Sequence, residues 1–281
     1  MTLLRYGYIS NGFADHSLEQ MVAVLARHGY RGIGITLDHH HLDPFAVTTA
    51  RIAELRALLT SAGLEPVIET GARYYLDGFR KHRPALVDPA PAGRRRRAEY
   101  YARAIDIAAA LGARCVSLWS GIQEPGSTAT DAWRWLADGL EPLVSQATSC
   151  GVTIGFEPEP GMFIESLANY RELKRWVPDL RLTLDLGHLA ITENSPLELH
   201  IATVQDDLRN VHIEDIRDRK HVHLPFGEGD LDFVALLGAL RRVNYQHLVL
   251  VELSRHSHEA PVQAQRSVEF LRAAERQAEN G

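Results

Sequence analysis

Four short apolar stretches of this sequence each carry, at or near their end, a residue that can bind a metal ion or move a proton. They are 153–159, 181–187, 210–215 and 247–253, which carry Glu157, Asp185, His212 and Glu252. Three carboxylates and one imidazole suit a divalent cation such as Mn²⁺, Mg²⁺, Co²⁺ or Zn²⁺. A purely structural zinc site would contain cysteine, so the excess of carboxylates argues against that kind of site.

A group of this composition suits proton transfer beside a carbonyl. Removing a proton from the neighbouring carbon needs a base and a group that stabilises the negative charge developing on oxygen. A divalent ion that holds the carbonyl and an adjacent hydroxyl stabilises that charge. Carboxylates on opposite sides of the carbon can act as base and acid, because burial raises a carboxyl pKa toward the working range. A single acid of this kind is better explained by a salt bridge or a helix cap, but four in successive stretches weaken that explanation.

The four stretches belong to a repeating pattern of strands and helices. Strand-like apolar runs occur at 5–10, 32–37, 65–70, 115–120, 153–159, 181–187, 210–215 and 247–253. Amphipathic segments that each end at a glycine lie between them, at 17–29, 44–63, 94–112 and 131–151. The first of these segments has Ser17 followed three residues later by Gln20, which predicts a capping box.

The alternation predicts an α/β protein with a (β/α)₈ TIM barrel, formed as a single domain by residues 1–281. The carboxyl ends of all strands then share one rim, which would bring the four residues together. A doubly wound open sheet is the alternative. No GxGxxG turn follows the first strand, which weakens the dinucleotide-binding form of that alternative.

The residues around these positions resemble a known family. The stretches are GFEPEPGMF, LTLDLGH, NVHIEDIRD, PFGEGDLDF and LVLVELS. They are similar to the xylose-isomerase-like TIM barrel superfamily of sugar phosphate isomerases and epimerases, which includes the family 2 AP endonucleases. The motifs D-x-G-H and G-E-G-x-x-D-F are specific to the superfamily but to no single reaction. The resemblance is clearest in the second half, and the eight-unit pattern extends it to the whole chain.

The resemblance implies roles for individual residues. The implied metal ligands are Glu157, Asp185, His212 and Glu252. Glu157 and Glu252 would also move protons, and His188 would contact a substrate oxygen. In the family an arginine shortly after the strand-seven histidine touches substrate, and Arg217 is the nearest match. His221 and His223 could also reach the substrate. Of the two, His223 is the better candidate for a substrate contact, because the residues from Pro225 onward resemble the family motif.

Two connections are long enough to shape a substrate pocket, 71–93 and 216–230. Both follow strands on the rim where barrel enzymes have their active sites. We expect part of 71–93 to fold over the barrel mouth and to bring Arg73 to the pocket, where it could bind a carboxylate or phosphate of the substrate. A surface salt bridge is the alternative for Arg73. The arginines at 94–97 begin a helix and predict a solvated face.

Composition limits the partners. With a net charge of −6, non-specific binding to nucleic acid is not expected. No run approaches the about 18 apolar residues of a membrane span, and the first residues lack the apolar core of a signal peptide. Cys115 and Cys150 have no CxxC partner, which suits a reducing compartment. We therefore expect a cytoplasmic protein with a small-molecule partner. The resemblance to the family also implies that the protein forms a homodimer.

The sequence thus predicts a divalent-metal-dependent isomerase or epimerase of a small sugar, sugar phosphate, polyol or keto-acid. A dehydratase of the inosose or dehydroshikimate type is the close alternative, because it uses much the same proton chemistry. A phosphodiesterase related to endonuclease IV would need more metal ligands and a basic groove. A ligand-binding barrel without catalysis stays open, since a fold does not fix a function.

Overall fold

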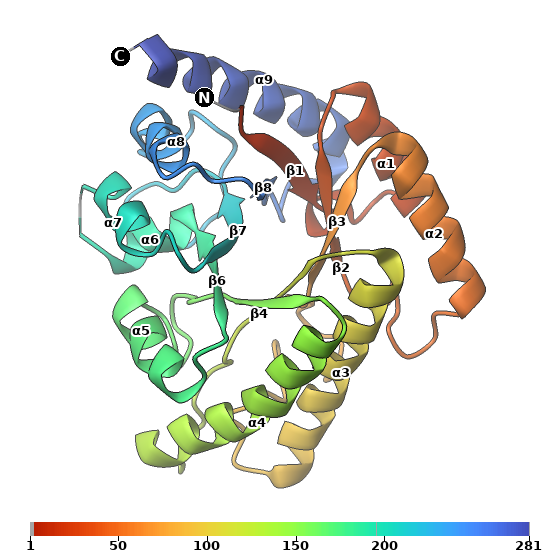
Figure 1. Ribbon diagram of the computed structural model, residues 1–281, viewed down its shortest axis with the longest axis vertical. Helices are drawn as coiled ribbons and strands as arrows, with labels where there is room; N and C mark the ends of the chain where they lie inside the picture. The colour runs from red at the N-terminus through yellow and green to blue at the C-terminus, as the bar shows by residue number, and fades with distance from the viewer. Residues whose placement is uncertain (1–2, 195, 281) are drawn as a thin grey trace.

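Eight parallel strands form a closed barrel in chain order, and helices surround it (Figure 1). The computed structural model of the protein describes residues 3–194 and 196–280. The strands are β1 (Arg5–Ile9), β2 (Gly32–Thr36), β3 (Glu65–Glu69), β4 (Cys115–Leu118), β5 (Thr153–Phe156), β6 (Arg181–Asp185), β7 (Leu208–Ile213) and β8 (Leu248–Val251). Because β1 pairs with both β2 and β8, the predicted TIM barrel is confirmed and the open sheet is wrong.

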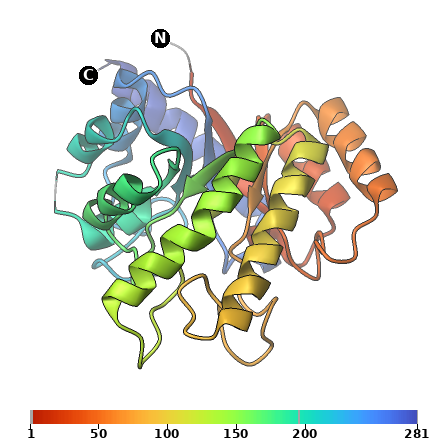
Figure 2. The ribbon, with the colours of Figure 1, turned by 60° about the horizontal axis from the view of Figure 1, so that its bottom comes forward.

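The helices follow the strands in alternation. They are α1 (Leu18–Arg27), α2 (Thr49–Ala62), α3 (Pro91–Leu111), α4 (Ala129–Ser149), α5 (Leu167–Trp176), α6 (Leu186–Thr192), α7 (Glu198–Thr203), α8 (Phe233–Arg242) and α9 (Ala260–Asn280), with short 3₁₀ turns η1 (Ser10–Phe13) and η2 (Ser257–Glu259). Figure 2 shows the long helices α3 and α4 side by side on the outside of the barrel. No helix in residues 3–194 and 196–280 is both long and apolar enough to cross a membrane.

Capping residues decide where the helices begin. The predicted capping box of α1 is present, with the backbone N–H of Gln20 donating to Ser17 and that of Ser17 donating back to Gln20. Helix α2 begins at Thr49, five residues after the predicted start at 44, because Thr48 caps it through the N–H of Arg51. The residues before Thr48 form a turn instead, closed by bonds to the carbonyl of Asp43.

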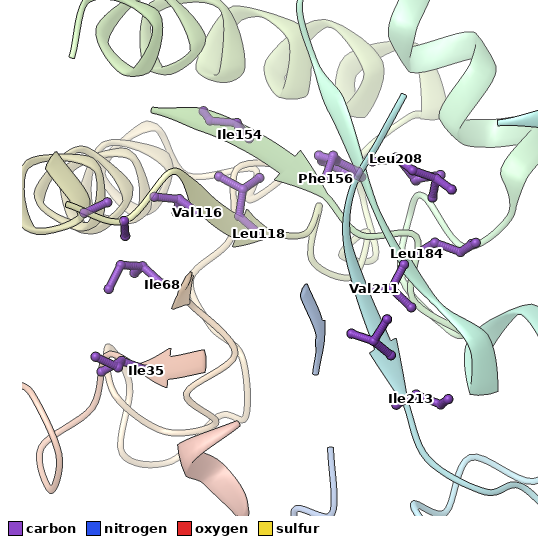
Figure 3. Close-up of a cluster of buried hydrophobic side chains, with 14 of the residues drawn as sticks. Ile35, Ile68, Val116, Leu118, Ile154, Phe156, Leu184, Leu208, Val211 and Ile213 are labelled. Carbon is purple, nitrogen blue, oxygen red and sulfur yellow. The ribbon is translucent and has the colours of Figure 1, made fainter. Parts of the chain in front are cut away.

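Apolar side chains fill two separate layers. The large layer lies between strands and helices; Figure 3 shows part of it, with Ile35, Ile68, Val116, Leu118, Ile154, Phe156, Leu184, Leu208, Val211 and Ile213 labelled. A small cluster fills the inside of the barrel and contains Ile9, Val67, Cys115, Leu248 and Leu250. His212 and Leu250 are register partners, so their side chains lie on the same inner face. The candidate site therefore lies directly above this inner cluster.

The absence of a side chain at Gly7 lets β1 pack closely against β2 and against the small cluster inside the barrel. A Cβ at this position would lie 2.4 Å from a methyl group of Leu250 and 2.9 Å from the backbone carbonyl of Gly32. The backbone cannot move away within a closed sheet, so Gly7→Ala should lower the free energy of unfolding by about 1–3 kcal/mol. Urea denaturation measures this. Gly78→Ala is the control, since nothing lies within 4 Å of its Cβ; equal effects would contradict the packing argument.

Arg97 departs from the expected solvated face of residues 94–97. Its side chain is only 2% exposed. The guanidinium donates to the carbonyl of Pro84 at 2.7 Å and lies over the ring of Trp119 at 5.0 Å. It therefore ties the start of α3 to the long connection before it, whereas Arg95 and Arg96 are exposed as expected. The four consecutive arginines look alike in the sequence. Only the packing of the preceding loop shows that Arg97 is the buried one.

Candidate metal and substrate site

The four strand-end residues lie together at the rim of the barrel. Asp185 is the last residue of β6, His212 lies in β7, and Glu157 and Glu252 directly follow β5 and β8. One ligand atom of each lies within 4.8 Å of those of the other three. The structure thus brings together the four residues that the sequence singled out, because parallel strands of a barrel end on the same face.

His212 presents one ring nitrogen to the carboxylates and the other to the barrel interior. Its Nδ1 lies 3.2 Å from Glu157 Oε1 and 3.3 Å from Glu252 Oε2. Its Nε2 lies 3.0 Å from Glu69 Oε1. Glu69, at the end of β3, can accept the Nε2 proton and leave Nδ1 free as a ligand, which is how metal-binding histidines are commonly oriented.

The donor set fits a divalent cation. Asp185 Oδ1 accepts a hydrogen bond from the backbone N–H of His188 at 2.7 Å. Its buried Oδ2 has no hydrogen-bond partner among the described residues. Three carboxylates so close together and so little exposed need positive charge nearby. A divalent ion would satisfy both the free oxygen and the excess of negative charge.

Glu214 supports the site from behind, and the sequence did not reveal it. Its side chain is fully buried, and burial together with the charge of Asp185 raises the pKa of Glu214 well above its ordinary value. A Cβ at Gly187 would lie 2.0 Å from Glu214 Oε1. The glycine of the D-x-G-H motif therefore makes room for this carboxyl group beside the candidate ligand Asp185.

The two candidate proton carriers differ in acidity. Burial raises the pKa of Glu157, although the charge of His212 opposes the shift. Burial would also raise the pKa of Glu252, but the charge of His223 and the hydrogen bond from His212 outweigh it, so that this pKa lies below its ordinary value. Burial raises the pKa of Glu159, which lines the same cavity, to about 8. Carboxyl groups with such different environments can serve as acid and base in one site.

Three histidines form a second group next to the first. The Nε2 atom of His221 lies 3.0 Å from that of His188 and 3.3 Å from that of His223. The Nδ1 atoms of His188 and His223 face the carbonyls of Pro158 and Glu252, at 3.3 and 3.1 Å. A carbonyl oxygen only accepts a hydrogen bond, so Nδ1 of both rings is the donor in these contacts. The Nε2 atom of each ring faces His221. The three atoms could contact substrate oxygens or hold a transition-metal ion.

Burial and the charge of His188 lower the pKa of His221 to about 4, so its ring is neutral at pH 7. The sequence argument preferred His223 over His221, whereas both rings line the cavity. The antiparallel bridge between Asp215 and Leu224 holds the intervening residues against the barrel mouth. Both rings reach the cavity because they alternate along the same short segment, and the preference for His223 as the substrate contact stays a prediction.

A cavity of about 350 Å³ opens above these groups. This volume lies in the range of small-molecule sites. Of the residues singled out from the sequence, those lining it are Glu157, His188, His212, His221, His223, Glu252 and Arg73, whereas Asp185 lies outside the lining. The amide of Asn11, from η1, also lines it and donates to Glu252 Oε1 at 2.9 Å. The polar lining suits a substrate with several oxygen atoms.

Arg217 is not brought to the cavity; its side chain is exposed. The reason is the conformation of the connection after β7. The carboxylate of Asp215 accepts hydrogen bonds from the backbone N–H groups of Ile216, Gly227 and Gly229. A Cβ at Gly229 would lie 2.2 Å from Asp215 Oδ1, so the G-E-G motif serves this backbone clamp. With the loop so held, Arg217 faces solvent.

The long connection 71–93 does border the cavity. Its residues Gly71, Arg73, Tyr74, Lys81 and His82 line the opening. Tyr74 and Phe79 are exposed, the latter by 97%. The connection therefore contributes side chains to the mouth, as the sequence argument expected of it.

Comparison with known proteins agrees with this geometry. A family model described as "Xylose isomerase-like TIM barrel" matches residues 22–274. The chain belongs to this family. The resemblance noted from the motifs of the second half is thereby confirmed, and the match extends into the first half of the chain.

Several proteins to which this chain is similar are named as sugar epimerases. A putative L-ribulose-5-phosphate 3-epimerase, SgbU of Haemophilus influenzae, is 24% identical over 172 residues, which are 58% of this chain and 60% of that protein. The L-ribulose-5-phosphate 3-epimerase UlaE of Salmonella paratyphi C is 27% identical over 76% of this chain and 77% of its own length. A solved L-ribulose 3-epimerase has the same fold, with a TM-score of 0.80, 22% identity and coverage of 99% of this chain and 96% of that one.

Proposed function

We propose that the protein is a divalent-metal-dependent epimerase or isomerase of a small ketose or its phosphate. The observation that carries the proposal is the cluster of Glu157, Asp185, His212 and Glu252, of which all but Asp185 line a polar cavity. Relatives named as L-ribulose-5-phosphate 3-epimerases support the reaction class. Their names favour proton transfer at a carbon beside a ketone over loss of water.

The same four residues would hold the metal ion. When bound, the ion would supply the positive charge that stabilises a substrate oxygen as the adjacent carbon loses its proton. Asp185 is fixed for this role by the backbone N–H of His188, and His212 by Glu69. Such second contacts keep Asp185 and His212 in place as ligands.

Glu252 and Glu157 would carry the protons. Glu252, oriented by Asn11 and with its pKa lowered, is ionised and can accept the proton from one face of the carbon. Glu157, with its pKa raised by burial, more readily holds a proton and can return one to the other face. His188 and His223 would bind substrate oxygens, and Arg73 would bind the far end of the substrate. No substrate contact is proposed for Arg217.

Exchange of hydrogen with solvent tests this proposal. Incubation with L-ribulose 5-phosphate, L-ribulose or D-tagatose in D₂O should place one deuterium per turnover on the carbon beside the carbonyl, as measured by NMR and mass spectrometry. The physical reason is that a proton held by a carboxyl group exchanges with water between turnovers. Product that contains no solvent deuterium would contradict the proposal and indicate a hydride shift. Product that has lost water would instead favour the dehydratase alternative.

A further inference from the structure

The outer end of the cavity is positively charged, whereas its floor is negatively charged. Its floor is rich in carboxylates, whereas the cations Arg73, Lys81 and Arg255 line it and are exposed at the opening. None of the three forms an ion pair within the described ranges 3–194 and 196–280. By contrast, Arg80 and Arg83 of the same connection are paired, with Asp77 and Glu124 respectively. Among the cations of the connection 71–93, the unpaired ones are thus those that line the cavity.

Two loops bring these cations together. Arg73 and Lys81 belong to the connection after β3, and the N–H of His82 donates to the carbonyl of Arg73 at 2.6 Å, which closes that loop. Arg255 belongs to the connection after β8. The guanidinium of Arg73 donates to the hydroxyl of Ser254 at 3.0 Å, so it reaches the residue next to Arg255. The cations therefore surround one side of the mouth.

His82 adds a neutral hydrogen-bonding group to this side. It lines the cavity and is 7% exposed, and its Nδ1 has no partner among the described residues. Burial, followed by the charges of Lys81, Arg97 and Arg73, lowers the pKa of His82 to about 3. The concentration of positive charge is thus large enough to act on a neighbouring ring, and an anion bound there would relieve it.

We propose that the substrate of this site carries an anionic group, a phosphate or a carboxylate, at the end remote from the reacting carbon, and that Arg73, Lys81 and Arg255 bind it. This inference rests on the proposed function. Guanidinium groups match the oxygens of phosphate and carboxylate in pairs, and a lysine adds a mobile point charge. The carboxylate floor repels an anion, so the charged end must lie outward and the carbonyl end inward. The two poles of the cavity would therefore orient the substrate.

The test compares anionic and neutral substrates of equal chain length. The substrates are L-ribulose, L-ribulose 5-phosphate and the analogue of L-ribulose in which C5, remote from the ketone at C2, is a carboxylate. The wild-type protein should have a higher kcat/KM for an anionic member than for the neutral sugar. Arg73→Gln, Lys81→Met and Arg255→Gln should each lower the ratio of anionic to neutral kcat/KM about 10- to 100-fold, mainly through KM. Arg80→Gln, which is outside the cavity, should leave activity and ratio unchanged.

The outcomes separate this inference from the proposed function. A preference for phosphate or for the terminal carboxylate identifies the anion, and either supports the subsite. Turnover of the neutral sugar with no preference, and no change of the ratio in the three variants, would overturn the inference and leave the epimerase proposal standing. Binding of inorganic phosphate, measured by calorimetry, should weaken at least tenfold in the Arg73→Gln/Lys81→Met double variant. That loss without turnover of any ketose would support the subsite and reject the epimerase; equal binding would reject the subsite.

Discussion

Glu157→Gln and Glu252→Gln are each expected to lower kcat by about 100- to 10,000-fold, because each removes a group that transfers a proton. Glutamine keeps the shape of the side chain and can still coordinate through its oxygen, but it cannot accept or return a proton. The measurements are kcat with the ketose that gives the highest turnover and the rate of deuterium incorporation from D₂O. Both rates should fall together in each variant.

Folding should be nearly unaffected by the same two substitutions. Both side chains lie at the barrel rim and contribute little to the apolar layers, so the free energy of unfolding of the metal-free protein should change by no more than about 1–2 kcal/mol. Glu228→Gln is the matched control, since this glutamate is exposed and outside the cavity. If either variant kept more than a tenth of the wild-type exchange rate, its glutamate would not be a proton carrier.

Removal of divalent metal should abolish turnover and lower the melting temperature. Without the ion, three carboxylates whose oxygens lie within 4.8 Å of one another repel each other, and Oδ2 of Asp185 has no hydrogen-bond partner in the described part of the chain. An ion present at 100 times its dissociation constant would raise the free energy of unfolding by about 2.7 kcal/mol. Thermal melts and activity after EDTA treatment, followed by re-addition of Mn²⁺, Mg²⁺, Co²⁺ or Zn²⁺, measure both effects.

Asp185→Asn provides the control for metal removal. Its neutral amide weakens the site, so EDTA should cause a much smaller shift of the melting temperature in this variant than in the wild type. Turnover by the wild-type protein that persisted in EDTA would exclude a metal role in catalysis. A shift of the same size in the variant would place the stabilising ion elsewhere in the protein.

The barrel and the four clustered residues could be predicted because both depend on local patterns. Strand and helix periods repeat along the chain, and a residue at the end of a parallel strand must lie on the common rim whatever its neighbours do. Asp185 and His212 are even register partners. The prediction thus required no knowledge of side-chain packing.

The remaining members of the site depend on contacts across the barrel or within loops. Glu69 also ends a strand, but its pairing with His212 joins β3 to β7 and has no local signature in the sequence. Glu214 acts through its position behind Asp185, which only Gly187 makes possible. Arg217 lies outside the cavity because the backbone hydrogen bonds to Asp215 set the direction of its loop, which the sequence does not reveal.

The clamp formed by Asp215 has a consequence for how this protein could acquire new specificity. One carboxylate holds the loop through backbone N–H groups at both of its ends, so the loop's conformation depends little on the side chains between them. His221 and His223 can then be exchanged without unfolding the segment that carries them. Mutations there would alter the two side chains of this loop that line the cavity, one at a time, on a fixed support. In directed evolution toward other sugars, substitutions that change specificity and are tolerated should therefore appear in this segment before they appear in the strands.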